Sequence, residues 1–200
     1  TQGVSYKELM FEAARGAYAD AGVDPRSEIY SFVCCSEDIE QGTSIFYEYV
    51  PGQLGAVQRP VQTVAADGLF GIATAVMLIR SGVAATVAVE SHSKASDVVS
   101  LGRVERFAMD PVLNRPLGVS ATALAGLEMR RWLHVTGRTE AECADVASRN
   151  RAHAASNPRA SYAGVNDPTP VFDPLTREQM AEPADGCVVL VLTNEERARK

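Results

Sequence analysis

The sequence predicts an α/β fold, because apolar segments of strand length and helix length alternate along the chain. A strand at 61–65 leads directly into a helix at 67–80, and another strand at 84–90 follows after a short joint. This succession is typical of a parallel sheet covered by helices on both faces. Further strands are expected at 29–35 and 187–193. With 200 residues, 46% of them apolar, the chain is large enough for one core and at most two.

The first helix is predicted by signals at both of its ends. Ser5 and Glu8 have the spacing of a capping box, and Gly22 is placed to end the helix. Between them, apolar residues recur with the period of one buried helical stripe: Tyr6, Leu9, Met10, Ala13, Ala14, Ala17, Tyr18 and Ala21.

The helix at 67–80 is apolar on nearly all of its sides. Its apolar residues are Leu69, Phe70, Ile72, Ala73, Ala75, Val76, Met77, Leu78 and Ile79. A helix without a polar face lies in the middle of a domain or at an interface. We therefore expect a homodimer or heteromer that associates through the region 61–92.

The second half of the chain predicts a long insertion, from about residue 94 to residue 183. Two helices are expected near 120–155, the second of which starts with a capping box at Thr139–Glu142. An irregular segment at 157–183 follows before the last strand. We interpret the chain as one layered domain, 1–200, that carries this insertion.

Charge and composition exclude several function classes. The net charge of −6 argues against binding to nucleic acid, which normally requires a basic surface. No apolar run approaches the 18 to 20 residues or so of a membrane span, and no signal peptide is evident, so we expect a cytoplasmic protein. The cysteines lack metal-ligand spacing and are expected to be reduced thiols, with no bound metal: Cys34, Cys35, Cys143 and Cys187.

The turn Val64-Ala65-Ala66-Asp67-Gly68 is the tightest strand-to-helix connection in the chain. Ligands of such sheets bind beyond the carboxyl ends of the strands, where helices begin. Asp67 is placed to cap the following helix, and Gly68 allows a close approach to the backbone. Two interpretations of Asp67 stay open, an ordinary helix cap and a residue of a functional site.

A resemblance to a known family starts from this turn. The residues Gln62 to Gly68, the helix ending in Ser81-Gly82 and the segment Glu90-Ser91-His92-Ser93 resemble the core of the thiolase superfamily. Other segments resemble its sterol-carrier-protein and archaeal acetyl-CoA acetyltransferase branch: Glu12 to Val23, Asp110-Pro111, Arg115 to Gly118, Glu128 to Arg131, Asn150 to Ala160 and Asp185-Gly186. The similarity covers almost the whole chain.

The resemblance implies a layered fold, with a mixed five-stranded sheet and a long loop-domain insertion. It also implies that a second, similar half of a thiolase is absent from this chain. The nucleophilic cysteine of the family falls on Ala65, and a serine of the family falls on Asp67. Because a methyl group cannot attack a carbonyl, we expect no covalent cysteine intermediate, and thus a degenerate thiolase site.

Several other residues are candidates for the site. His92 stands where the family usually has methionine, and we expect it beyond a strand end near the turn, either as a polar group of the acyl pocket or as a loop histidine at a subunit contact. We expect Ala65, Ala66 and Gly68 to contact substrate. The aromatic residues Phe46, Tyr47 and Tyr49 either line a channel or pack beneath a loop.

These features predict a thiolase-like protein of lipid metabolism that acts on acyl-CoA. One hypothesis is carbon–carbon bond cleavage or formation of the aldolase type, with Asp67 and His92 as catalytic residues, CoA thioester as substrate and no other cofactor. Related aldolases associate with a small OB-fold protein, which is therefore an expected partner. The alternative is a non-catalytic subunit of a heteromeric acyl-CoA enzyme. A cysteine-dependent acyltransferase with its thiol delivered from elsewhere is a third hypothesis.

Overall fold

The computed structural model describes residues 3–36, 46–161, 167–181 and 183–199. The chain forms two compact units. The sheet unit comprises Thr1–Val99 and Ala184–Lys200, and the insertion unit comprises Ser100–Pro183.

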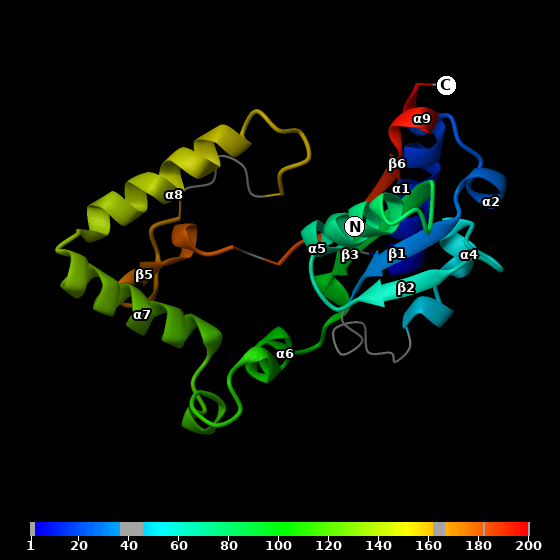
Figure 1. Ribbon diagram of the computed structural model, residues 1–200. Coiled ribbons are helices and arrows are strands. Elements are labelled where there is room, and N and C mark those ends of the chain that lie inside the picture. Colours follow the sequence, from blue (N-terminus) through cyan, green and yellow to red (C-terminus); the bar gives the residue numbers. More distant parts are fainter. Residues whose placement is uncertain (1–2, 37–45, 162–166, 182, 200) are drawn as a thin grey trace. The chain divides into compact units, whose positions relative to one another are not determined.

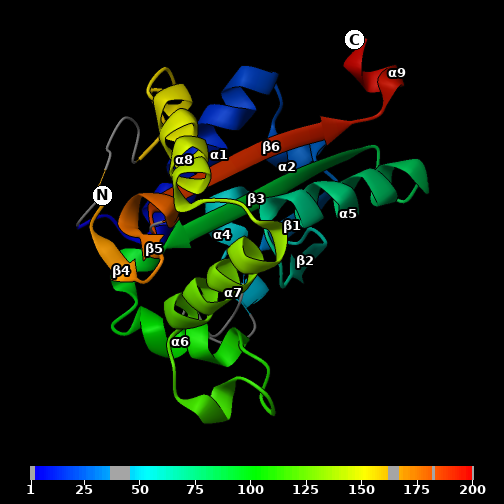
Figure 2. The same ribbon diagram turned by 90° about the vertical axis from the view of Figure 1, so that its left-hand side faces the viewer.

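The sheet unit is built on a four-stranded sheet (Figure 1). Its order is β2 (Val61–Val64), β1 (Ser31–Cys35), β3 (Thr86–Lys94) and β6 (Asp185–Thr193). The first three strands are parallel, and β6 pairs antiparallel with β3, beside which it runs in Figure 2. The predicted mixed α/β fold is confirmed. The described residues give this sheet four strands rather than the five that the resemblance implies.

One helix covers each face of the sheet. Helix α1 (Tyr6–Ala21) buries Met10, Ala14 and Tyr18 on one face, which we call the α1 face. Helix α5 (Gly68–Arg80) packs on the opposite α5 face, where Ala75 joins a separate apolar cluster. All five residues of β1 are buried, as expected for a central parallel strand.

The predicted helix ends are confirmed. Ser5 and Glu8 exchange the two hydrogen bonds of a capping box, and Gly22 ends α1 with a φ of 65°. A second capping box, between Thr139 and Glu142, starts α8 (Glu140–Ala154). Each cap satisfies backbone N–H groups that have no partner inside the helix.

Strand β3 continues past the predicted end at Glu90, as far as Lys94. Its ladder with β6 extends through His92 opposite Cys187 and Lys94 opposite Asp185. The expectation that His92 lies beyond the strand end is therefore wrong, because an antiparallel partner from far along the chain lengthens the strand.

A buried ion pair closes this end of the β3–β6 ladder. Lys94 Nζ lies 2.7 Å from Asp185 Oδ2, and the Ser96 backbone N–H donates to Asp185 Oδ1 at 3.0 Å. Hydrogen bonding to Asp185 raises the pKa of Lys94, so the ammonium stays protonated at neutral pH. The pair joins the two strands where the insertion leaves the sheet unit and returns to it.

The insertion unit contains α6 (Leu101–Ala108), α7 (Ala121–Thr136) and α8. Contrary to the expectation of an irregular segment at 157–183, its described part includes the antiparallel strands β4 (Pro170–Phe172) and β5 (Leu175–Thr176). The remaining short elements of the chain are α2 (Pro25–Glu28), η1 (Phe46–Glu48), α4 (Pro51–Leu54), η2 (Ala95–Asp97), η3 (Arg115–Leu117), η4 (Arg177–Gln179) and α9 (Glu195–Ala198).

Candidate active site

The turn between β2 and α5 has the predicted form. Strand β2 ends at Val64, and Asp67 is the N-cap of α5. Asp67 Oδ1 accepts hydrogen bonds from the N–H groups of Leu69 at 3.0 Å and Phe70 at 3.4 Å. The carboxylate thus lies at the positive end of the helix dipole, and Ala65 is exposed two residues before it.

A hollow of about 310 Å³ lies beside the first turn of α5, and we call it the α5 pocket. It is lined by Asp67, Gly68, Leu69, Ile72, Val89, Ser91, Val188 and Leu190. Among these side chains only Asp67 and Ser91 are polar. The pocket therefore combines apolar walls with two oxygen-bearing side chains, an arrangement typical of small-molecule sites.

Two glycines of α5 allow this close packing. A methyl group at Gly68 would lie 3.2 Å from Ser91 Cβ and 3.4 Å from Ser91 Oγ. A methyl group at Gly71 would overlap Cys35 Sγ and lie 2.9 Å from Val89 Cγ1. The start of α5 consequently sits directly on the end of β1 and the middle of β3, and Gly68 has no side chain to cover the Ser91 hydroxyl.

His92 and Asp67 lie on opposite faces of the sheet. Successive residues of a strand point to alternate faces, and Val89 and Ser91 line the α5 pocket. Glu90 and His92 consequently point to the α1 face, where His92 Nδ1 lies 2.7 Å from Glu90 Oε1 and both side chains are buried. The structure therefore does not bring the two proposed catalytic side chains together.

Several side chains pack around His92 and its partner Glu90 on the α1 face. Its ring stacks on Tyr6 with centroids 5.8 Å apart, and the Cys187 thiol donates to Glu90 Oε1 at 3.4 Å. Burial raises the pKa of Cys187, and the Glu90 charge raises it further. These contacts make His92 part of the packed interior and not a loop histidine.

Three of the four thiols are held in their protonated form. Burial, followed by the Glu90 charge, raises the pKa values of Cys34 and Cys35 as well as that of Cys187. Cys35 lies beneath Gly71 and is 2% exposed, and it does not line the α5 pocket. A thiolate nucleophile needs the opposite environment, partly exposed and electropositive.

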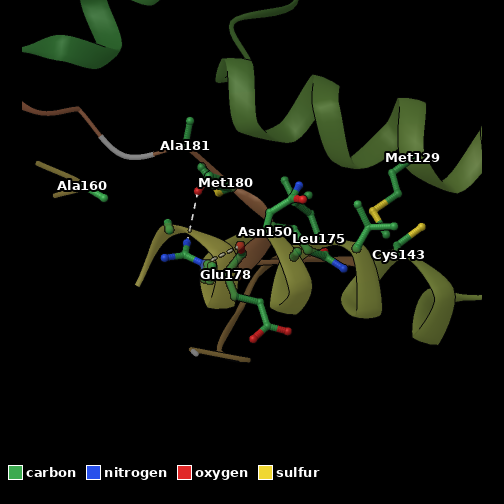
Figure 3. A pocket seen from close by; sticks show the side chains of 13 residues that line it. Met129, Cys143, Asn150, Ala160, Leu175, Glu178, Met180 and Ala181 are labelled. Carbon is green, nitrogen blue, oxygen red and sulfur yellow. Dashed lines mark hydrogen bonds between the residues drawn. The ribbon is translucent and has the colours of Figure 1, made fainter. Parts of the chain in front are cut away.

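A larger hollow, of about 590 Å³, lies within the insertion unit between α7 and α8 (Figure 3). Met129 and Cys143 lie together at one end of it, and Met180 and Ala181 at the other. Arg151 donates from Nε to the Glu178 carbonyl at 2.9 Å, which fastens α8 to the segment after β5. The guanidinium therefore holds the fold of this unit together.

The remaining expectations concern three aromatic residues, metal binding and membrane spans. Tyr47 and Tyr49 are exposed and do not line the α5 pocket, whereas the Phe46 side chain lies outside the described part. Among the described residues, no three His, Cys, Asp or Glu side chains are grouped so as to hold a metal ion. Within the same residues, every helix is too short or too polar to cross a membrane.

Comparison with known proteins relates the chain to acyl-CoA enzymes. It is 26% identical over 210 residues to an acetyl-CoA acetyltransferase of Methanothermobacter thermautotrophicus, covering 98% of this chain and 54% of that protein. It is 25% identical over 215 residues to a 17-hydroxy-3-oxo-4-pregnene-20-carboxyl-CoA lyase of Mycobacterium tuberculosis, covering 98% of this chain and 55% of the lyase. No protein-family model matches the chain.

A solved structure agrees with these relatives. The Ltp2-ChsH2(DUF35) aldolase superimposes on the whole chain and on 53% of its own chain, with a TM-score of 0.73 and 25% identity. The chain is thiolase-like. It spans about half the length of the curated relatives that it matches.

In this thiolase-like chain, sequence analysis missed Ser91 as a residue of the pocket. The signal was present, because Val89 belongs to a buried strand and the residue two positions later must share its face. It was missed because β3 was expected to end at Glu90, which leaves the orientation of the next residues undefined.

Proposed function

We propose that this thiolase-like chain belongs to an acyl-CoA enzyme that forms or breaks a carbon–carbon bond next to a CoA thioester, without a covalent cysteine intermediate. CoA thioester is the proposed substrate, and no other cofactor is invoked. The acyl end of the substrate occupies the α5 pocket.

The observation that carries this proposal is the chemistry of the turn at the start of α5. An alanine, Ala65, is exposed where the resemblance places the family's nucleophile. Cys35 is the thiol that packs beneath this helix, and it is buried with a raised pKa. A relative named as a lyase and a structural neighbour named as an aldolase support chemistry of this type.

A retro-aldol step needs only groups of the kind found at this turn. Asp67 accepts the proton of a β-hydroxyl group on the substrate, and the Cα–Cβ bond breaks as the β-carbon becomes a carbonyl. The bonding electrons pass to the thioester, whose enolate oxygen accepts a hydrogen bond from the Gly68 N–H. Asp67 then returns this proton to Cα, which releases the shortened acyl-CoA and restores the carboxylate. Ala65 and Ala66 contact the substrate without reacting.

An apolar surface beside the pocket supports an assembly. Leu69 and Met77 on α5 are 74% and 63% exposed, and Val188 on the neighbouring β6 is 59% exposed. Leu69 and Val188 both line the α5 pocket, so exposed apolar side chains adjoin there, as they do at many interaction sites. We propose that a homodimer or heteromer forms through the 61–92 region. A small OB-fold protein is a proposed further partner.

A non-catalytic subunit remains the second candidate function. The observation that favours it is the scarcity of polar side chains in the α5 pocket, where Asp67 and Ser91 are the only two among the described lining residues. Such a subunit would keep the fold and the apolar surface, while an active partner performs the reaction.

The test is product analysis with the complete protein and any partner that co-purifies with it. Incubation with a β-hydroxyacyl-CoA is expected to yield a carbonyl compound and a shortened acyl-CoA, both detected by mass spectrometry. An Asp67→Asn variant of this chain serves as control. If that variant turns over substrate as fast as the wild type, the chemistry resides elsewhere and the non-catalytic subunit is favoured.

A further inference from the structure

We propose that Ser91 is a substrate-contacting residue of the α5 pocket, whose hydroxyl donates a hydrogen bond to an oxygen of the bound CoA thioester, and that Glu90 and His92 position it from the opposite face of the sheet. The inference rests on the proposed function and adds a recognition residue and its support.

The Ser91 hydroxyl is available for a ligand. Its side chain lines the α5 pocket, and within the described residues it makes no side-chain hydrogen bond to another group. A hydroxyl group carries one donor and two acceptor sites, so that of Ser91 is available to bond a ligand in the pocket. Asp67, the other polar group of the pocket, already uses Oδ1 to cap α5.

Ser91 is accessible because the residue above it is a glycine. Gly68 lies directly over Ser91, and a methyl group there would lie within 3.4 Å of its oxygen. The Gly68 N–H belongs to the first turn of α5, whose N–H groups have no partner within the helix. The Ser91 hydroxyl therefore lies close to the start of α5, where backbone N–H groups offer further donors to an oxygen atom of the substrate.

Two bonded side chains flank Ser91 on the strand. The residues on either side of it, Glu90 and His92, bond to each other at 2.7 Å on the α1 face. Tyr6 stacks on the imidazole, and Cys187 donates to the carboxylate. The ladders with β1 and β6 hold the backbone of Ser91, opposite Cys35 and Val188, and the pair on the α1 face braces the two residues that flank it.

The test uses the complete protein and compares Ser91→Ala with Ser93→Ala. Ser93 is on the same strand and the same face but does not line the pocket. We expect Ser91→Ala to lower kcat/KM for a β-hydroxyacyl-CoA about 10-fold, as for loss of one hydrogen bond. We expect Ser93→Ala to change it less than about twofold, and both variants to unfold at the wild-type urea concentration.

A double-mutant cycle tests the positioning role. If His92 acts through Ser91, His92→Met combined with Ser91→Ala should reduce kcat/KM no further than Ser91→Ala alone. His92→Asn, which keeps a donor near the Nδ1 position, should restore most of the activity that His92→Met loses. It also provides a folded variant should His92→Met fail to fold.

The possible outcomes distinguish a failure of the Ser91 inference from a failure of the proposed function. A wild-type protein that neither binds nor cleaves CoA thioesters overturns both. Wild-type turnover with Ser91→Ala equal to Ser93→Ala overturns the substrate contact alone. Additive losses in the double variant, or no rescue by His92→Asn, overturn the positioning role of the pair.

Discussion

The imidazole of His92 lies 2.7 Å from the carboxylate of Glu90, two residues earlier on the same strand, and neither side chain reaches solvent. Residues two apart on a strand share a face, so this contact needs no distant partner. It places a polar pair in the interior of the sheet unit, on the α1 face. The α5 pocket, which Ser91 lines, lies on the opposite face of the sheet.

His92→Met is expected to destabilise the protein by about 3–5 kcal/mol, because removal of one partner leaves the Glu90 carboxylate buried without its bond. Urea unfolding followed by circular dichroism measures this change. The matched control is His134→Met, on the exposed surface of α7, which should change the free energy of unfolding by less than about 0.5 kcal/mol. Equal effects of the two substitutions would show that the pair does not stabilise the fold.

Asp67→Asn and Asp67→Ala separate the cap from the proposed base. Asparagine still caps a helix, so Asp67→Asn should leave stability nearly unchanged, whereas Asp67→Ala should cost about 1 kcal/mol. Both variants lack the carboxylate and should lose at least about 100-fold in turnover of a β-hydroxyacyl-CoA. The measurements are urea unfolding and steady-state kinetics. Full activity of Asp67→Asn would exclude Asp67 as the proton acceptor.

Two glycines within helices should respond to alanine in opposite directions. Gly71→Ala should destabilise the protein by about 1–3 kcal/mol, because its methyl group would overlap Cys35 and crowd Val89. Gly16→Ala, in α1 with no neighbouring atom within 4 Å, should stabilise it by about 0.5–1 kcal/mol. Thermal unfolding of both variants tests the close approach of α5 to the sheet. A stabilising Gly71→Ala would contradict it.

The thiols should react with iodoacetamide in a definite order. Burial and the Glu90 charge raise the pKa values of Cys34, Cys35 and Cys187, so these residues stay protonated and slow to label as the pH rises through about 8.5, where an ordinary thiol ionises. Cys143, partly exposed on α8, should label first. Peptide mass spectrometry after timed labelling checks the order. Rapid labelling of Cys35 would reveal a reactive thiol beneath α5.

The helices α1, α5, α7 and α8 were predictable because their signals are local, whereas α6 was not predicted. Ser5 with Glu8, and Thr139 with Glu142, mark helix starts within four residues of sequence. The cap formed by Asp67 followed from the same kind of signal. Since each cap depends only on neighbouring backbone groups, sequence alone defines it.

The site was less predictable because it depends on pairing between distant residues. The extension of β3 through His92 requires β6, which pairs His92 with Cys187 from the other end of the chain. Ser91 is already held by the parallel ladder, opposite Cys35 of β1, and its face follows from that of Val89. The burial of His92 against Glu90 follows from the pairing with β6, so the expectation of a loop position was wrong for a reason the local sequence does not contain.

The most direct test of the central claim is the intact mass of the complete protein during turnover of an acyl-CoA or a β-hydroxyacyl-CoA. A site that presents Ala65 in place of a thiol should cleave the β-hydroxyacyl-CoA while the mass of this chain stays unchanged. As a positive control, Ala65→Cys, which places a thiol just before the start of α5, should gain the mass of one acyl group when mixed with acyl-CoA. An acyl adduct on the wild-type chain, removed by hydroxylamine, would contradict the account.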